Sequence, residues 1–296
     1  MSEIISVLPE EPRKALVALA TFRFLTPKQF VDLGVAASET VMRDYVLARL
    51  ERRARPLSKS YKIGSFLPKV HYLTKHGAEE LEKLYRLDPG TIPYPKGQVQ
   101  FSALFAEHRF AQVNFHIGVR RWAHTLPDAD FLFADMDFET NGSVRHGNRV
   151  RKSEIFIPEY DNPIVPDGIF KVAFRDKPVI YVMEIHRTTQ TKAVGTQLKK
   201  YMDVLATNAV NFKYGVSNVP TYICSVHTLD NVLRGAKEYL QADPDYEHFK
   251  HLFLFNTAAQ LKDDFSAGWH EADGTERYPF PTAKEPQSGL LVDNLF

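Results

Sequence analysis

The sequence predicts an α+β fold divided between a helical N-terminal part and a sheet-rich C-terminal part. Residues 1–90 carry apolar side chains mostly at helical spacing, with one strand-like run near the end. A turn-rich stretch with Pro89, Gly90 and Gly97 follows, as is typical of a domain boundary. Beyond it, strand-like runs alternate with helical ones and include a hairpin within 164–186, which favours a mixed sheet with helices around it.

The composition is that of an ordinary globular protein. The chain has 296 residues, enough for two domains, and a net charge of only +1. Binding to nucleic acid must therefore come from local clusters of charge. The single cysteine, Cys224, excludes an internal disulfide and fits a reducing cytosol. Because no apolar run is long enough to span a bilayer and the N-terminus lacks a signal-peptide pattern, we expect a cytoplasmic protein that does not bind membranes.

Three helices are expected at the N-terminus. The first covers 12–22, where apolar residues recur at helical spacing. Thr26 caps a second, short helix with Pro27 at its first position, and Ser38 caps a third helix that extends to Arg53. The side chains of this third helix that are expected to face inward are Val41, Tyr45, Leu47 and Leu50.

A strand at 69–74 and a last helix at 78–85 complete this part of the chain. Three helices, a hairpin and a closing helix are typical of a winged helix-turn-helix, and the stretch His71-Tyr72-Leu73-Thr74 resembles the strand of many winged-helix regulators. In that arrangement the third helix enters the major groove of DNA and the hairpin contacts the phosphate backbone.

A local cluster of positive charge supports DNA binding. Between Arg43 and Lys62 the chain carries seven basic residues and only two acidic ones. Phosphate contacts require such a cluster in an otherwise neutral chain. The predicted DNA-binding residues are Arg43, Arg49, Arg52, Arg53, Arg55, Lys59 and Lys62. A solvated helix face, or a module that docks another protein, is the alternative explanation.

The C-terminal part is predicted to begin with a helix at 101–122 that has an apolar stripe. Strands are expected at 131–138, 155–157, 164–174, 178–186, 221–226 and 251–255, and helices at about 192–207 and 229–240. The last segment, 266–296, is punctuated by Pro and Gly, so we expect a poorly packed tail.

The hairpin carries the strongest candidate site. A turn symmetric about Asp176 and Lys177 places Asp167 opposite His186, with Glu184 on the same face because strand side chains alternate. The other face is apolar and suited to a core. An Asp, a Glu and a His on one strand face form a candidate metal or acid/base site, although polar residues at strand ends often only face solvent.

These residues, with the following helix, resemble the PD-(D/E)XK nuclease core. The resemblance implies that Asp167 and Glu184 hold Mg²⁺, an ion that prefers carboxylate oxygens. The family has a water-activating Lys two residues after the Glu, where this chain has His186. Lys200, or the neighbouring Lys199, is a candidate substitute, and Gln197 is expected to position the phosphate. At this position the chain therefore departs from the catalytic pattern of the family.

Over most of its length the chain also resembles the replication-relaxation family of plasmids and mobile elements. The matching residues are Leu25, Thr26 and Gln29, the stretch 71–77, His108-Arg109, 165–168, and Glu184 and Arg187 in the strand 183–188. His186 stands where the family tends to have Asp. The resemblance implies a DNA-associated protein that acts in replication, copy-number control or mobilisation of a genetic element.

The predicted organisation is therefore a winged helix-turn-helix at 1–90, a linker at 91–100, a PD-(D/E)XK-like domain with a mixed sheet at 101–265, and a tail at 266–296. The expected function is DNA binding with a nuclease-like domain that need not cut. One alternative is an active Mg²⁺-dependent endonuclease or nickase. Another is a scaffold for replication proteins, because 290–296 weakly resembles peptides that bind the bacterial sliding clamp. A homodimer stays open, since winged-helix proteins often bind as dimers.

Overall fold

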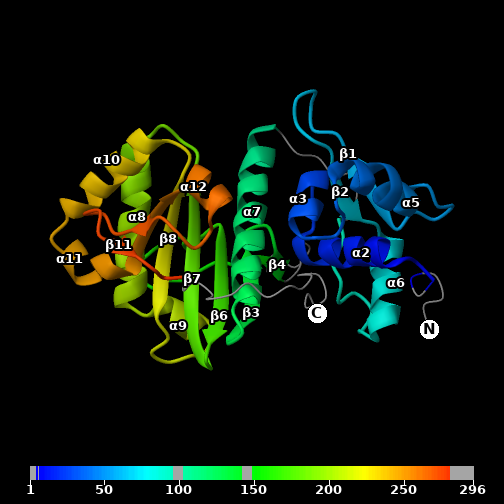
Figure 1. Ribbon diagram of the computed structural model, residues 1–296. Helices are drawn as coiled ribbons and strands as arrows, with labels where there is room; N and C mark the ends of the chain where they lie inside the picture. Colours follow the sequence, from blue (N-terminus) through cyan, green and yellow to red (C-terminus); the bar gives the residue numbers. More distant parts are fainter. Residues whose placement is uncertain (1–4, 6, 96–102, 142–148, 281–296) are drawn as a thin grey trace. The chain divides into compact units, whose positions relative to one another are not determined.

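A computed structural model describes residue 5 and residues 7–95, 103–141 and 149–280 (Figure 1). The fold is α+β with a mixed sheet, as predicted. The chain forms two compact units, and the division falls between Ile117 and Gly118, inside helix α7 (Ala103–Thr125). The boundary between the two units therefore does not fall in the linker predicted at 91–100. The reason is that Val113 and Ile117 of α7 belong to the core of the first unit.

The first unit has the predicted order of three helices, a hairpin and a helix. The third helix consists of α4, a π-helical segment η1 and α5. The elements are α2 (Glu10–Phe22), α3 (Pro27–Asp32), α4 (Glu39–Val41), η1 (Met42–Leu47), α5 (Ala48–Glu51), β1 (Ser58–Tyr61), β2 (Val70–Leu73) and α6 (Lys75–Tyr85). Strands β1 and β2 pair antiparallel, with Ser58 opposite Leu73.

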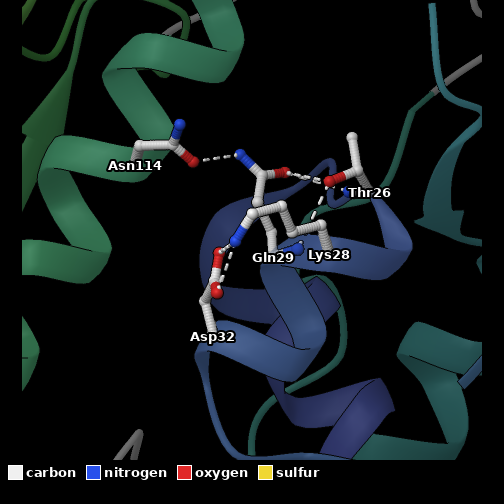
Figure 2. Close-up of polar contacts among 5 residues, drawn as sticks. All are labelled: Thr26, Lys28, Gln29, Asp32 and Asn114. Carbon is white, nitrogen blue, oxygen red and sulfur yellow. Dashed lines mark hydrogen bonds and ion pairs between the residues drawn. The ribbon is translucent and has the colours of Figure 1, made fainter. Parts of the chain in front are cut away.

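The Thr26 and Gln29 pair has a structural role. Thr26 caps α3 by accepting a hydrogen bond from the Gln29 amide, and the Gln29 side chain in turn accepts from the Thr26 backbone at 2.9 Å. Figure 2 shows that the Gln29 side-chain amide also donates to Asn114 Oδ1 at 2.8 Å, which ties α3 to α7. An exposed ion pair of Lys28 and Asp32 lies on the outer side of the same helix. Gln29 is buried, so it stabilises the unit rather than offering a surface for a ligand.

The prediction that Val41 and Tyr45 face inward is wrong. Tyr45 is 72% exposed and Val41 is 39% exposed. The residues of the helix that enter the core are Met42, Val46, Leu47 and Leu50. The π-helical segment holds more residues per turn than an α-helix, so the buried stripe differs from the one that a regular period predicts.

The residue types in the stretch 71–77 are explained by local hydrogen bonds and close packing. Thr74 caps α6 by accepting a hydrogen bond from the Gly77 amide at 3.0 Å. A Cβ added at Gly77 would lie 2.0 Å from the Leu57 carbonyl oxygen, so only glycine fits there. His71 Nδ1 lies 2.8 Å from Glu51 Oε1, which joins the third helix to the hairpin. These residues therefore hold the hairpin on the helices.

The second unit is built on a seven-stranded mixed sheet in the order β11-β10-β9-β8-β7-β6-β3. Strands β7, β8 and β9 run parallel, and the other neighbours pair antiparallel. The sheet strands are β3 (Ala129–Met136), β6 (Gly168–Phe174), β7 (Lys177–His186), β8 (Thr221–His227), β9 (Phe253–Thr257), β10 (Trp269–His270) and β11 (Glu276–Arg277), and a separate pair is β4 (Thr140–Asn141) with β5 (Val150–Arg151). The predicted strand at 155–157 is replaced by a single bridge between Ile155 and Ile164.

Helices connect the parallel strands. Helix α8 leads from β7 towards β8 and α10 from β8 towards β9, and these two helices contact each other (Figure 1). The helices of this unit, besides the end of α7, are α8 (Thr191–Ala206), α9 (Ala209–Lys213), α10 (Asp230–Gln241), α11 (Tyr246–Phe249), the 3₁₀ turn η3 (Lys250–Leu252) and α12 (Ala258–Asp263). Cys224, on β8, is fully buried as predicted, and burial raises the pKa of its thiol.

The register of the β6–β7 hairpin differs from the predicted one by two residues. Phe170 lies opposite Tyr181, not Met183, because the turn is formed by Arg175 and Asp176. Both turn residues have positive φ values, 48° and 62°, as a two-residue type I′ hairpin requires. A shift of two preserves which side chains share a face. Asp167 and Glu184 therefore remain on one face, and the continued register places them opposite each other.

We expect Asp176→Gly to raise the free energy of unfolding of the second unit by about 1 kcal/mol, since a side chain at positive φ costs about that much. Asp176→Ala is the matched control and is expected to lower it, because Ala lacks the local hydrogen bonds that help Asp tolerate this conformation. Urea unfolding followed by tryptophan fluorescence measures both. Equal stability of the two variants would contradict the turn geometry.

Both faces of the hairpin are buried, whereas the sequence predicts one buried face. Ile180 and Val182 share the face of Glu184 and pack with Leu198 of α8 in the core. On the opposite face, Tyr181 packs against Trp122 of α7 and Phe280. Asp167, Glu184 and His186 are therefore enclosed rather than open to solvent.

The prediction of a poorly packed tail is wrong for residues 266–280. Strands β10 and β11 extend the sheet, and Trp269 and Phe280 are fully buried. Phe280 lies 5.0 Å from Trp122 and 4.8 Å from Phe265 between ring centroids. The aromatic area that these side chains remove from water outweighs the local turn signals of Gly and Pro. The proposed clamp-binding peptide at 290–296 lies outside the described residues.

Candidate functional site

A row of buried polar side chains crosses the sheet of the second unit near the carboxyl ends of β7 and β8. Parallel pairing places Glu184 beside Ser225 and His186 beside His227. Asp167 comes directly before β6, and its Oδ2 accepts a hydrogen bond from the Ile185 amide at 2.7 Å. Ligands of α/β sheets bind at the carboxyl ends of parallel strands, so this is the natural place for a site in this unit.

Glu184 is the centre of the row. It is 3% exposed, and the hydroxyl of Tyr201 and the side chain of Gln197, both on α8, form hydrogen bonds with its carboxyl group. Burial raises the pKa of Glu184 well above its ordinary value, and the nearby charge of Asp167 raises it further. Asp137 adds a smaller effect in the same direction. The surroundings of Glu184 therefore favour the protonated form of its carboxyl group.

Two histidines end the row. The ring centroids of His186 and His227 lie 4.8 Å apart, and Ser225 Oγ lies 2.8 Å from His227 Nε2. Burial lowers the pKa of His227 to about 3, and the positive charges of His186 and Lys237 act in the same direction. His227 is therefore neutral at physiological pH, and it can accept or donate one hydrogen bond at each ring nitrogen but carries no charge.

The structure brings Asp167, Glu184 and Gln197 together and places His186 beside them in the same row. It does not bring the lysines to them. Lys199 forms an ion pair with Asp243 at 2.7 Å, and Lys200 is exposed, with its ammonium 5.9 Å from the ring centroid of Tyr160. Of the predicted residues, only His186 is therefore placed where it could take over the role of the missing catalytic lysine.

Sequence reasoning missed Tyr201, Ser225 and His227. Tyr201 follows Gln197 by four residues, and residues at that spacing share a helix face. Ser225 and His227 alternate along β8 as Glu184 and His186 do along β7, but only the parallel pairing of these strands brings the four together. The helical spacing was a usable signal, whereas the strand pairing was not visible in the sequence.

The oxygen donors of Asp167 and Glu184 suit Mg²⁺, and these two residues would hold it. Metal ligands bind in their deprotonated form, so metal binding would have to overcome the preference of the buried Glu184 for its protonated form. In the part of the chain that the structure describes, no three His, Cys, Asp or Glu side chains lie close enough together to hold a metal ion. Any bound Mg²⁺ would thus depend on two carboxylates, with water and phosphate as the remaining ligands.

We expect the Glu184→Gln variant to gain stability relative to the natural protein as the pH rises. The raised pKa means that the folded protein binds this proton more tightly than the unfolded chain does. The stabilisation from the proton is complete below about pH 4.5, the ordinary pKa of the group, and is lost as the pH rises towards the raised value. Gln keeps the hydrogen-bond acceptor for Tyr201 and cannot ionise.

Unfolding in urea at about pH 5 and about pH 8 measures this difference. Glu276→Gln, which changes an exposed carboxylate of the same unit, is the matched control and should show no such trend. The same pH dependence in the Glu184→Gln variant and the natural protein would contradict the assignment of the buried proton.

The first unit carries a second candidate site, which we call the basic surface: Arg43, Arg49, Arg52, Arg53, Arg55, Lys59 and Lys62. All are exposed except Arg53, which is half-buried. Arg43 forms an ion pair with Asp44 at 2.7 Å, but the other six form no ion pair with any described residue. Glu51, the nearest acid along the chain, is bound to His71 instead. The positive charge of the surface is therefore largely uncompensated.

No protein-family model matches the chain, and neither do the curated proteins or the solved structures with which it was compared. Among the described residues, no helix is both long and apolar enough to cross a membrane.

Proposed function

We propose that the protein binds duplex DNA through the basic surface of its first unit. The observation that carries this proposal is the uncompensated charge of six of its seven cations, which lie on the third helix, the following loop and the hairpin. An anionic polymer with a regular charge spacing is the partner that such a surface fits. The resemblance to the replication-relaxation family makes the DNA of a plasmid or mobile element the expected target.

The arrangement of the first unit supports a winged-helix mode of binding. The exposed side of the third helix carries Val41, Tyr45 and Arg49, a mixture of apolar and cationic groups that can contact base edges in the major groove. Lys59 and Lys62 lie on the hairpin and would contact phosphates. In this proposal the helix provides sequence recognition, and the hairpin provides affinity.

We assign the second unit as a nuclease-like domain that does not cut. The arrangement of Asp167 and Glu184 supports the resemblance to the PD-(D/E)XK core, but three features argue against cleavage. Burial favours the protonated form of Glu184, whose carboxyl group accepts a hydrogen bond from Tyr201, and a histidine stands in the position of the lysine. Lys199 and Lys200 of α8, the two candidate substitutes, are placed elsewhere. Without a permanent positive charge, the site lacks the group that stabilises charge developing on a phosphate.

A Mg²⁺-dependent endonuclease is the second candidate. The observation that favours it is the position of Asp167 and Glu184 on one face, opposite each other in the continued register of the hairpin. In that case His186 would accept the proton of the attacking water, and Gln197 would position the phosphate once Glu184 ionises.

Incubation of the protein with supercoiled plasmid and Mg²⁺ or Mn²⁺ separates the two candidates. We expect the plasmid to be retarded on a gel at low salt and to remain supercoiled. Asp167→Asn and Glu184→Gln are the control variants, because each keeps the shape of the side chain. Metal-dependent nicking that both variants lose would establish the endonuclease, and absence of any retardation would contradict DNA binding.

A further inference from the structure

Phe66, in the loop of the β1–β2 hairpin, is completely exposed, with a relative accessibility of 101%. It lies between Gly64, which has a positive φ of 62°, and Pro68. A phenylalanine left exposed gains no free energy from burial and so contributes little to the stability of the folded unit. A side chain in this position is therefore available to another molecule.

The loop around Phe66 is anchored. Ile63 is 2% exposed and forms a small core with Val70 and Ala106, against which the half-buried Leu67 packs. Two of the three large apolar residues of the loop thus fold inward, and Phe66 alone points away from this core. The anchoring reduces the entropy that the loop would lose on binding, which favours tight contact by the exposed ring.

The charge of the hairpin identifies the class of partner. Between Ser58 and Leu73 the chain carries Lys59, Lys62 and Lys69, all exposed, and no acidic residue. An apolar ring surrounded by cations fits a surface in which aromatic groups are enclosed by anions. Duplex DNA has this character, because its stacked bases lie between two rows of phosphates.

We propose that Phe66 is an apolar wedge that contacts the bases of duplex DNA and bends it. The wedge would enter the minor groove beside the site occupied by the third helix, while the three lysines contact the flanking phosphates. Insertion of an apolar side chain partly unstacks one base step, and the duplex kinks away from the protein. Flexible pyrimidine–purine steps would then be preferred at this position. This inference rests on the proposed DNA binding, and it adds how the hairpin contacts and bends the duplex.

A tryptophan probe tests the contact in the full-length chain. We expect the fluorescence of Phe66→Trp to fall when a mixed-sequence duplex of roughly 30 base pairs is added, since stacking on bases quenches an indole. The matched control is Phe212→Trp, which changes the 89% exposed Phe212 of the second unit and should show no quenching. Equal responses of the two variants would overturn the proposal. A change with anionic phospholipid vesicles and none with DNA would overturn it in favour of a membrane contact.

A second measurement separates the wedge from DNA binding as such. With dyes at both ends of the same duplex, the natural protein should increase energy transfer, whereas Phe66→Ala should not, and should bind roughly tenfold more weakly. Its salt dependence should be unchanged because no charge is removed. Bending and affinity equal to those of Phe212→Ala would overturn the wedge and leave the proposed function intact. Absence of binding by the natural protein would overturn both.

Discussion

Replacement of Arg49, Arg52 and Arg53 together by Gln is expected to abolish retention of duplex DNA on a gel. Each cation that contacts a phosphate releases counterions from the DNA, so the loss of three contacts should lower affinity on the order of a hundredfold at low salt. The dependence of log Kd on log salt should become shallower by about 0.9 per lost contact, or roughly three units in all. Fluorescence anisotropy with a labelled duplex, over a range of salt concentrations, measures both quantities.

The matched control replaces three exposed lysines of the second unit, Lys177, Lys192 and Lys262, by Gln. It removes the same net charge from the protein but leaves the basic surface intact, and its binding should be close to that of the natural protein. Because Arg53 is half-buried, unchanged thermal unfolding of the arginine variant is required. Unchanged DNA binding at both low and high salt would contradict the assignment of this surface.

Phe280→Ala is expected to lower the free energy of unfolding of the second unit by about 3–5 kcal/mol, the usual loss when a buried phenylalanine is truncated. The ring is fully buried, and its centroid lies 4.6 Å from that of Tyr181 and 5.4 Å from that of Trp269. The cavity left by Ala would be lined by aromatic side chains that are held by the sheet and by α7, so it cannot collapse easily. The effect would show that 266–280 belongs to the folded unit.

Urea unfolding followed by tryptophan fluorescence measures this loss. The two tryptophans of the chain, Trp122 and Trp269, both lie in the second unit, so the signal reports that unit alone. Tyr278→Ala, which changes a 66% exposed aromatic two residues away, is the matched control and should change stability by less than about 0.5 kcal/mol. If Phe280→Ala lowered the free energy of unfolding by no more than Tyr278→Ala does, the packing of this segment would be contradicted.

The local features of the chain were predictable from the sequence. Thr26, Ser38 and Thr74 each begin a helix by accepting a backbone hydrogen bond, and all three signals lie within four residues of their effect. The order of elements in the first unit follows from these caps and from hydrophobic spacing. Asp167 and Glu184 share a face of the hairpin because alternation along a strand does not depend on the turn, and a register shift of two preserves it.

The features that were mispredicted depend on longer-range packing. The turn at Arg175 and Asp176 uses positive φ values, which neither residue type signals as strongly as Asn-Gly would. Tyr45 is exposed because a π-helical segment changes which side of the helix meets the core. Trp269 and Phe280 become buried only because β10 joins β9 and because the Phe280 ring packs against both Trp269 and Trp122, the latter more than a hundred residues earlier in the chain.

The sequence by itself determined the division into a helical and a sheet-rich part, the caps, the cluster of basic residues, and the shared face of the two carboxylates. These depend on propensity and periodicity, which act over a few residues. The tertiary structure alone decided that Glu184 is buried where its protonated form is favoured, that Tyr201 and His227 converge with it, and that Phe66 is left outside a packed loop. Such outcomes depend on which distant surfaces exclude water from a side chain, and no local pattern encodes that choice.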